Sequence, residues 1–98
     1  MNEITKVSDI TNKDLAEYLR LDEVTDDDER TLDNLLGVAK NYIKNYTGKQ
    51  DLDNSQDFVI VVFILVQDMW DNRVLYVDKN NVNQTVDSIL SLHAVNLL

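Results

Sequence analysis

The residues best suited to nucleophilic chemistry are the single histidine, His93, and the serines that precede it at Ser88 and Ser91. A hydroxyl activated by an imidazole is the core of a hydrolytic triad. Such sites also need a glycine-bearing turn that presents the serine, and no elbow or orienting motif of that kind surrounds these residues. We therefore expect a structural or surface histidine, and we predict no enzymatic activity and no catalytic residues.

A second chemical candidate is the acidic run Asp22–Glu29, in which six of eight residues carry carboxylates. Carboxylate oxygens are ligands for hard divalent cations, but the run lacks the sixth-position glycine and closing glutamate of an EF-hand loop. Acidic residues also stabilise the positive N-terminal end of a helix dipole. We interpret Asp26–Glu29 as a solvated helix start, and we expect neither a metal nor a cofactor.

The composition limits what the chain can be. Its 98 residues predict one domain spanning residues 1–98. The net charge of −9 argues against a general binder of duplex DNA or anionic membranes, because both rely on clustered Lys and Arg. Cysteine is absent, which excludes disulfides and thiolate metal sites. The start of the sequence lacks the apolar segment of a signal peptide, which predicts a cytosolic chain.

The chain contains no proline, so its helices must be interrupted by clusters of polar residues. These clusters divide the chain into four segments. Thr11, with Asp14 three residues later, predicts a capped helix start. Residues 1–10 are either an N-terminal arm or part of the same packing, and residues 93–98 form a C-terminal tail. The expected helices span residues 12–21, 27–46, 56–73 and 86–92. These elements predict an all-α fold, a small bundle of three main helices plus a short C-terminal helix.

The clearest helical pattern lies in the second segment. Gly48 is placed where a left-handed residue would end that helix. Its apolar face follows the i, i+3, i+4, i+7 spacing of an amphipathic helix. The residues of that face are Leu32, Leu35, Leu36, Ala39, Tyr42, Ile43 and Tyr46.

Phe58–Val66 is a run of nine apolar residues that fits either a buried strand or a helix. Helix is favoured because the element continues to Arg73 and follows two good capping residues, Asn54 and Ser55. The run is too short to span a membrane, which needs about 20 apolar residues. A helix that is apolar on every side must be surrounded by its own bundle or by another subunit.

Taken in order, these segments resemble the small head–tail connector proteins of tailed bacteriophages, also described as adaptor or DNA-packaging proteins. The resemblance covers about residues 14–92. Its parts are Glu17–Asp22, the acidic turn Asp26–Glu29, the pattern Leu35 to Gly48, the buried helix ending in Trp70–Arg73, and Val86–Leu90. The chain departs from the family at Ser91–Ala94, where the family commonly has a proline and an arginine.

The resemblance implies a structural virion assembly protein whose protomers form a ring beneath the portal and join the DNA-filled head to the tail. The implied partners are other copies of the chain, the portal protein and a further head–tail joining or tail-completion protein. DNA would pass through the channel without sequence-specific binding, and no membrane is involved. The implied location is the head–tail junction of the virion, with the host cytoplasm during assembly.

Subunit contacts are expected where apolar surface exceeds what a 98-residue core can hide. The predicted contact residues are Trp70, Arg73, Tyr76, Val77, Val95, Leu97 and Leu98. A different class of function stays open, namely a small acidic helical inhibitor that mimics DNA and binds a basic nucleic-acid-binding protein.

Overall fold

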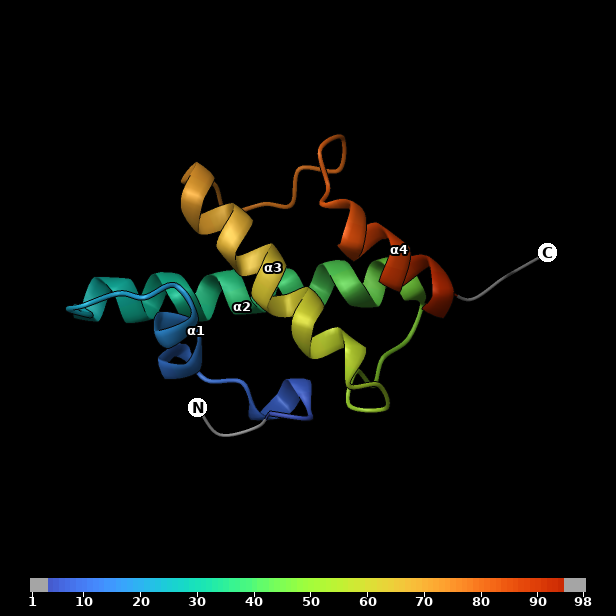
Figure 1. Ribbon diagram of the computed structural model, residues 1–98, viewed down its shortest axis with the longest axis horizontal. Coiled ribbons are helices and arrows are strands. Elements are labelled where there is room, and N and C mark those ends of the chain that lie inside the picture. Colours follow the sequence, from blue (N-terminus) through green and yellow to red (C-terminus); the bar gives the residue numbers. More distant parts are fainter. Residues whose placement is uncertain (1–3, 95–98) are drawn as a thin grey trace.

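The computed structural model describes residues 4–94, and within that range all regular structure is helical (Figure 1). The elements are a 3-10 turn, η1 (Val7–Asp9), followed by α1 (Asn12–Tyr18), α2 (Asp26–Thr47), α3 (Asp57–Asn72) and α4 (Gln84–His93). The predicted all-α class and the order of four helices are confirmed. The ambiguous run Phe58–Val66 lies within α3 and is helical.

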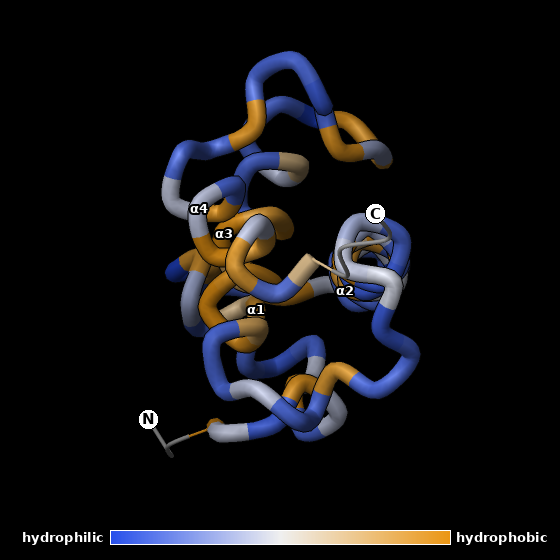
Figure 2. The backbone as a smooth tube through the Cα atoms, turned by 90° about the vertical axis from the view of Figure 1, so that its right-hand side faces the viewer, coloured by the Kyte–Doolittle hydropathy of each residue, from blue (hydrophilic) through white to orange (hydrophobic). Residues whose placement is uncertain are grey.

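The longest helix, α2, lies along the long axis of the molecule, which measures 48 Å. α3 crosses α2 and makes the most extensive contact with it, while α1 and α4 each pack against both long helices. Figure 1 shows α1 and α4 on opposite sides of α3. Figure 2, which looks along α2, shows the other three helices gathered on one side of it. The apolar face of α2 therefore meets a layer made by the remaining helices.

Two helices begin with the same capping arrangement. In α1, the Thr11 hydroxyl accepts from the Asp14 N–H, and the Asp14 carboxylate accepts from the Thr11 N–H at 2.8 Å. Thr25 and Asp28 repeat this box at the start of α2, with both bonds at 3.1 Å. The first box was expected and the second was not, although the spacing of Thr25 and Asp28 is identical.

The helix ends differ in how well the sequence predicts them. Gly48 ends α2 with a φ of 73°, as its position indicated. α1 ends at Tyr18, before the predicted residue 21, because Arg20 adopts a left-handed φ of 58°. Arg73 has the same φ after α3. At the end of α1, the Arg20 N–H donates to the Glu17 carbonyl and the Leu21 N–H donates to the Ala16 carbonyl. An equivalent pair of backbone bonds closes α3, so both helices end in a Schellman motif.

Most of the core comes from α2 and α3. The five aliphatic residues of the predicted α2 face are buried, and the two tyrosines at its edge are half-buried. Seven residues of Phe58–Val66 are buried within this single chain, whereas Ile64 is half-buried and Ile60 is 55% exposed. Because α1, α2, α4 and η1 pack against α3, most of its surface is covered within one chain. A second subunit is therefore not required to cover that part of the helix.

The described part of the N-terminal segment, residues 4–10, is packed and not a free arm. Val7 and Ile10 are buried in the core. Ser8 lies against the loop before α3, where its Oγ donates to Asp53 Oδ2 at 2.7 Å and its N–H donates to Asp53 Oδ1 at 3.0 Å. These bonds hold the pKa of Asp53 below its ordinary value of 3.8, with the Ser8 hydroxyl making the largest contribution.

Replacing Ser8 with alanine is expected to raise the pKa of Asp53 toward its ordinary value, because the ionised carboxylate loses its hydroxyl donor. A group whose pKa is lowered by folding stabilises the fold above its unfolded pKa, and that contribution disappears as pH falls through the folded pKa. In the wild type, the stabilising contribution of ionised Asp53 should therefore be retained to a lower pH than in Ser8→Ala. Titration of the carboxyl carbons by NMR measures this, with Asp78 as an unchanged internal control. An unaltered Asp53 pKa would contradict the assignment.

Candidate subunit-contact surface

The predicted contact residues within the described range gather around the end of α3. Trp70 lies in the last turn of the helix and is half-buried, and Arg73 is exposed at the left-handed position that follows. Tyr76 and Val77 belong to the non-helical segment that leads away from the helix end toward α4 (Figure 1). The other three predicted residues, Val95, Leu97 and Leu98, lie outside the described residues.

The segment Val74–Val77 divides this surface into two hollows. Val74 and Val77 are half-buried, whereas Leu75 is 62% exposed and Tyr76 is 61% exposed. Val74 lines both hollows, Leu75 lines one, and Tyr76 with Val77 lines the other. The predicted residues are thus close in space but belong to two different concavities.

The first hollow lies between the start of α2 and the end of α3 and has a volume of about 220 Å³. Five of its eight lining residues are apolar, and Asp28, Thr31 and Arg73 bring polar groups into it. The lining residues are Asp28, Thr31, Leu35, Met69, Trp70, Arg73, Val74 and Leu75. Trp70 and Arg73, two residue types enriched at the centres of protein interfaces, therefore share one concavity.

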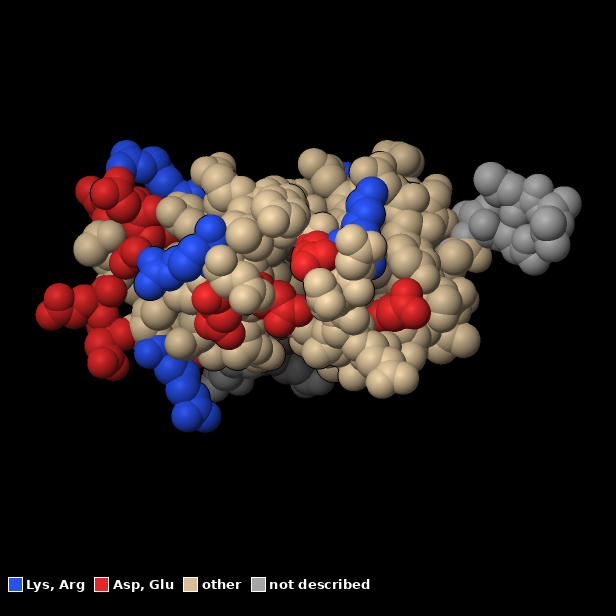
Figure 3. All heavy atoms as spheres, turned by 90° about the horizontal axis from the view of Figure 1, so that it is seen from above, with Lys and Arg blue, Asp and Glu red and all other residues tan. Residues whose placement is uncertain are grey.

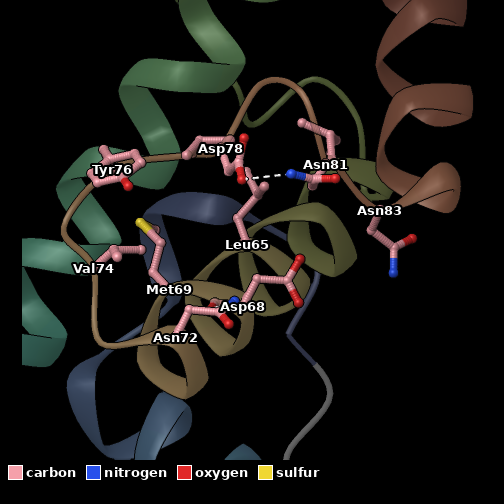
Figure 4. A pocket seen from close by; sticks show the side chains of 11 residues that line it. Leu65, Asp68, Met69, Asn72, Val74, Tyr76, Asp78, Asn81 and Asn83 are labelled. Carbon is pink, nitrogen blue, oxygen red and sulfur yellow. Dashed lines mark hydrogen bonds between the residues drawn. The ribbon is translucent and has the colours of Figure 1, made fainter.

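The second hollow, of about 250 Å³, lies between α3 and the loop before α4, and five of its eleven lining residues are Asp or Asn (Figure 4). Burial, with a smaller effect from Asp71, raises the pKa of Asp68. Across the hollow, the Asn81 side chain donates to Asp78 Oδ2 at 2.9 Å, which lowers the pKa of Asp78 together with the Asn80 N–H. Among residues 4–94, no three His, Asp or Glu side chains converge where a metal ion could bind.

His93 contacts residues from other segments and neither of the serines beside it in sequence. Its Nε2 lies 3.4 Å from both Ser55 Oγ and Asp57 Oδ2, and its Nδ1 lies 3.3 Å from Lys49 Nζ. A triad needs the hydroxyl and the carboxylate on opposite ring nitrogens, whereas here both lie at Nε2. The ring also packs on Phe58, with centroids 4.7 Å apart. His93 thus ties the end of α4 to the start of α3.

Five exposed large apolar residues of the described chain were not among the predicted contact residues, namely Tyr18, Val24, Ile60, Leu75 and Leu92. Ile60 on α3 is 55% exposed, and Leu92 on α4 is 83% exposed. Both positions depart from the periodic spacing of the buried residues in their helices, such as Val86 and Leu90 in α4. Their exposure could therefore have been predicted from helical periodicity.

Charge is distributed unevenly along the molecule. Figure 3 shows acidic side chains gathered at the end of the long axis where α2 begins. The first turn of α2, Asp26–Glu29, supplies four of these carboxylates. Arg30 pairs with Asp27 in the same region, so the acidic charge is only partly compensated there.

Comparison with protein-family profiles, with curated proteins and with solved structures finds no match for this chain. Within residues 4–94, no helix is both long enough and apolar enough to cross a membrane.

Proposed function

We propose that this chain is a structural assembly protein of a tailed bacteriophage, a head–tail connector whose protomers form a ring beneath the portal. The ring would join the DNA-filled head to the tail and leave a channel through which DNA passes. Its partners would be other copies of the chain, the portal protein and a further joining or tail-completion protein. The order of sequence motifs that resemble this family motivates the proposal.

The structural observation that supports it most is the exposed apolar surface at the end of α3. Leu75 and Tyr76 expose more than half of their surface, and Leu75 lines the same hollow as Trp70 and Arg73. Exposed apolar patches mark contact sites, and Trp and Arg are enriched at the centres of such sites. Arg73 also keeps a left-handed backbone that favours glycine, at a cost of about 1 kcal/mol.

The purified protein, alone or with portal protein, is expected to form a closed ring in negative-stain images, with a native mass that is a multiple of 11.3 kDa.

Arg73→Gly should stabilise the protomer by about 1 kcal/mol, because glycine relieves the left-handed strain. We expect this variant to weaken assembly because the guanidinium is lost.

Arg20→Gly is the matched control, because Arg20 has the same φ of 58° and is also exposed, but it does not line the first hollow. It should stabilise the protomer equally and leave assembly unchanged. Wild-type protein that stays monomeric at high concentration, with and without portal, would contradict the connector proposal.

A second candidate function rests on the acidic end of the molecule, where Asp26–Glu29 lie together in one turn. A small acidic helical protein could occupy the DNA site of a basic protein by charge mimicry. Such an inhibitor would be a monomer or dimer whose binding weakens steeply as salt is added. Salt-sensitive binding to a basic protein without ring formation would favour this candidate.

A further inference from the structure

The second hollow, between α3 and the loop before α4, combines apolar and polar groups. Leu65, Met69 and Val82 contribute apolar side chains, and Tyr76 adds an aromatic ring. The residues that contribute carboxylate or amide groups are Asp68, Asn72, Asp78, Asn81 and Asn83. A hollow of this composition suits a ligand that has both an apolar part and a polar head.

The two charged residues that line this hollow are aspartates on facing elements. Figure 4 shows the Asp68 carboxylate, on α3, and the Asp78 carboxylate, on the loop before α4, on either side of Leu65. Asn81 donates to Asp78 from the same loop. Among residues 4–94, neither aspartate forms an ion pair. The hollow therefore presents negative charge from two of its sides.

The basic residues of the chain do not compensate this charge. Arg73 and Lys79, which are nearest to the two aspartates in sequence, line other hollows. Burial and the neighbouring Asp71 raise the pKa of Asp68, and no lysine or arginine contributes to the pKa of Asp68 or of Asp78. A carboxylate in this environment is stabilised by a cation that comes from outside the chain.

An arginine side chain matches these features better than a metal ion or a lysine does. The guanidinium is planar, has five N–H donors in a fixed fork and stacks on aromatic rings. Its methylene stem packs on apolar surface while its head remains among polar groups. A metal ion would need several oxygens in one coordination sphere. Within residues 4–94, no three acidic or histidine side chains converge in that way.

The hollow is also large enough for this group. Its volume of about 250 Å³ exceeds the roughly 150 Å³ of an engineered cavity that binds benzene. A guanidinium group has fewer heavy atoms than benzene, so it fits together with part of its methylene stem.

We infer that the second hollow binds an arginine side chain of a partner protein, with the guanidinium against the Asp68 and Asp78 carboxylates and the stem on Leu65 and Val82. An arginine within a polypeptide is favoured over the free amino acid, because it has no α-carboxylate for a chain of net charge −9 to repel. The inference goes beyond the proposed function and does not depend on ring formation.

The test titrates Nα-acetyl-arginine N-methylamide into the isotope-labelled full chain and follows the protein by NMR. We expect the amide signals of residues 65–69 and 74–83 to shift, because these segments line the hollow. Nα-acetyl-lysine N-methylamide should bind several-fold more weakly, since its ammonium lacks the planar fork. Free arginine should also bind more weakly than the blocked form.

Asp68→Asn keeps the shape of the side chain and should weaken binding of the blocked arginine on the order of tenfold, because a charge-assisted hydrogen bond is lost. Asp71→Asn is the matched control, since Asp71 is exposed in the same helix but does not line the hollow. Its effect should be clearly smaller. Tyr76→Ala, at an exposed position, should weaken binding several-fold, whereas Tyr76→Phe keeps the ring and should bind as the wild type does.

Several outcomes would overturn the inference. Signal shifts centred on the acidic start of α2, or equal losses for Asp68→Asn and Asp71→Asn, would show attraction by net charge without a site. Blocked lysine that binds as tightly as blocked arginine would remove the assignment to arginine. Free arginine that binds more tightly than the blocked form would make the amino acid the ligand, and calcium chloride that displaces blocked arginine at equal concentration would make a metal ion the ligand. None of these results bears on whether the chain forms a ring.

Discussion

Replacing Phe58 with alanine is expected to lower the free energy of unfolding by about 3–5 kcal/mol, the range for large aromatic side chains in a close-packed core. Phe58 is fully buried in the first turn of α3. Its ring also packs on His93, with centroids 4.7 Å apart, and Lys49 Nζ lies 5.9 Å from its centre. The substitution would therefore leave a cavity and also remove the ring against which His93, at the end of α4, packs.

Chemical denaturation followed by circular dichroism measures the global effect, and hydrogen exchange locates it. We expect the amides in the last turn of α4 to exchange faster than those in the middle of α2. Phe58→Leu is the matched control, because it keeps an apolar side chain at the site and should cost clearly less. A loss below about 1 kcal/mol for Phe58→Ala would contradict the assignment of this residue to the core.

Ile43→Ala is expected to cost about 2–5 kcal/mol, because Ile43 is fully buried on the face of α2 that meets the other helices. Ile60→Ala removes the same atoms from a helix position that is 55% exposed. Its effect should stay within about 0.5 kcal/mol, as for an ordinary surface substitution.

Because both changes are Ile→Ala in a helix interior, the difference in helix propensity cancels between the two variants. The difference in their denaturation midpoints therefore reports burial alone. Similar losses for Ile43→Ala and Ile60→Ala would mean that the two faces have been assigned wrongly.

The sequence was informative wherever a local physical rule determined the structure. The apolar face of α2, from Leu32 to Ile43, follows from helical periodicity, and the structure confirms it as buried. Thr11 marks a helix start because its hydroxyl accepts from the backbone of the first turn, and Gly48 marks a helix end because it adopts a left-handed backbone. The helical state of Phe58–Val66 followed from the length of the element, because its β-branched composition alone would equally suit a strand.

Other features depended on contacts that a local pattern does not encode. The left-handed turns at Arg20 and Arg73 have no compositional signal, because arginine ordinarily avoids that conformation. The partners of His93 come from segments 36 to 44 residues away, so the neighbouring serines were misleading candidates.

The candidate site shows the same division. Trp70 and Arg73 could be proposed from residue type and spacing. Their common hollow could not, because it also requires the start of α2, about forty residues earlier, to lie beside the end of α3.

One consequence concerns α2, a single uninterrupted helix of 22 residues. At 1.5 Å per residue it is about 33 Å long, and it connects the end of the molecule that holds the hollow with the end that presents Leu92. Adding one residue to an α-helix turns its two ends relative to each other by about 100° and separates them by a further 1.5 Å. In the proposed ring, α2 thus fixes the distance and the rotation between the two ends of each protomer.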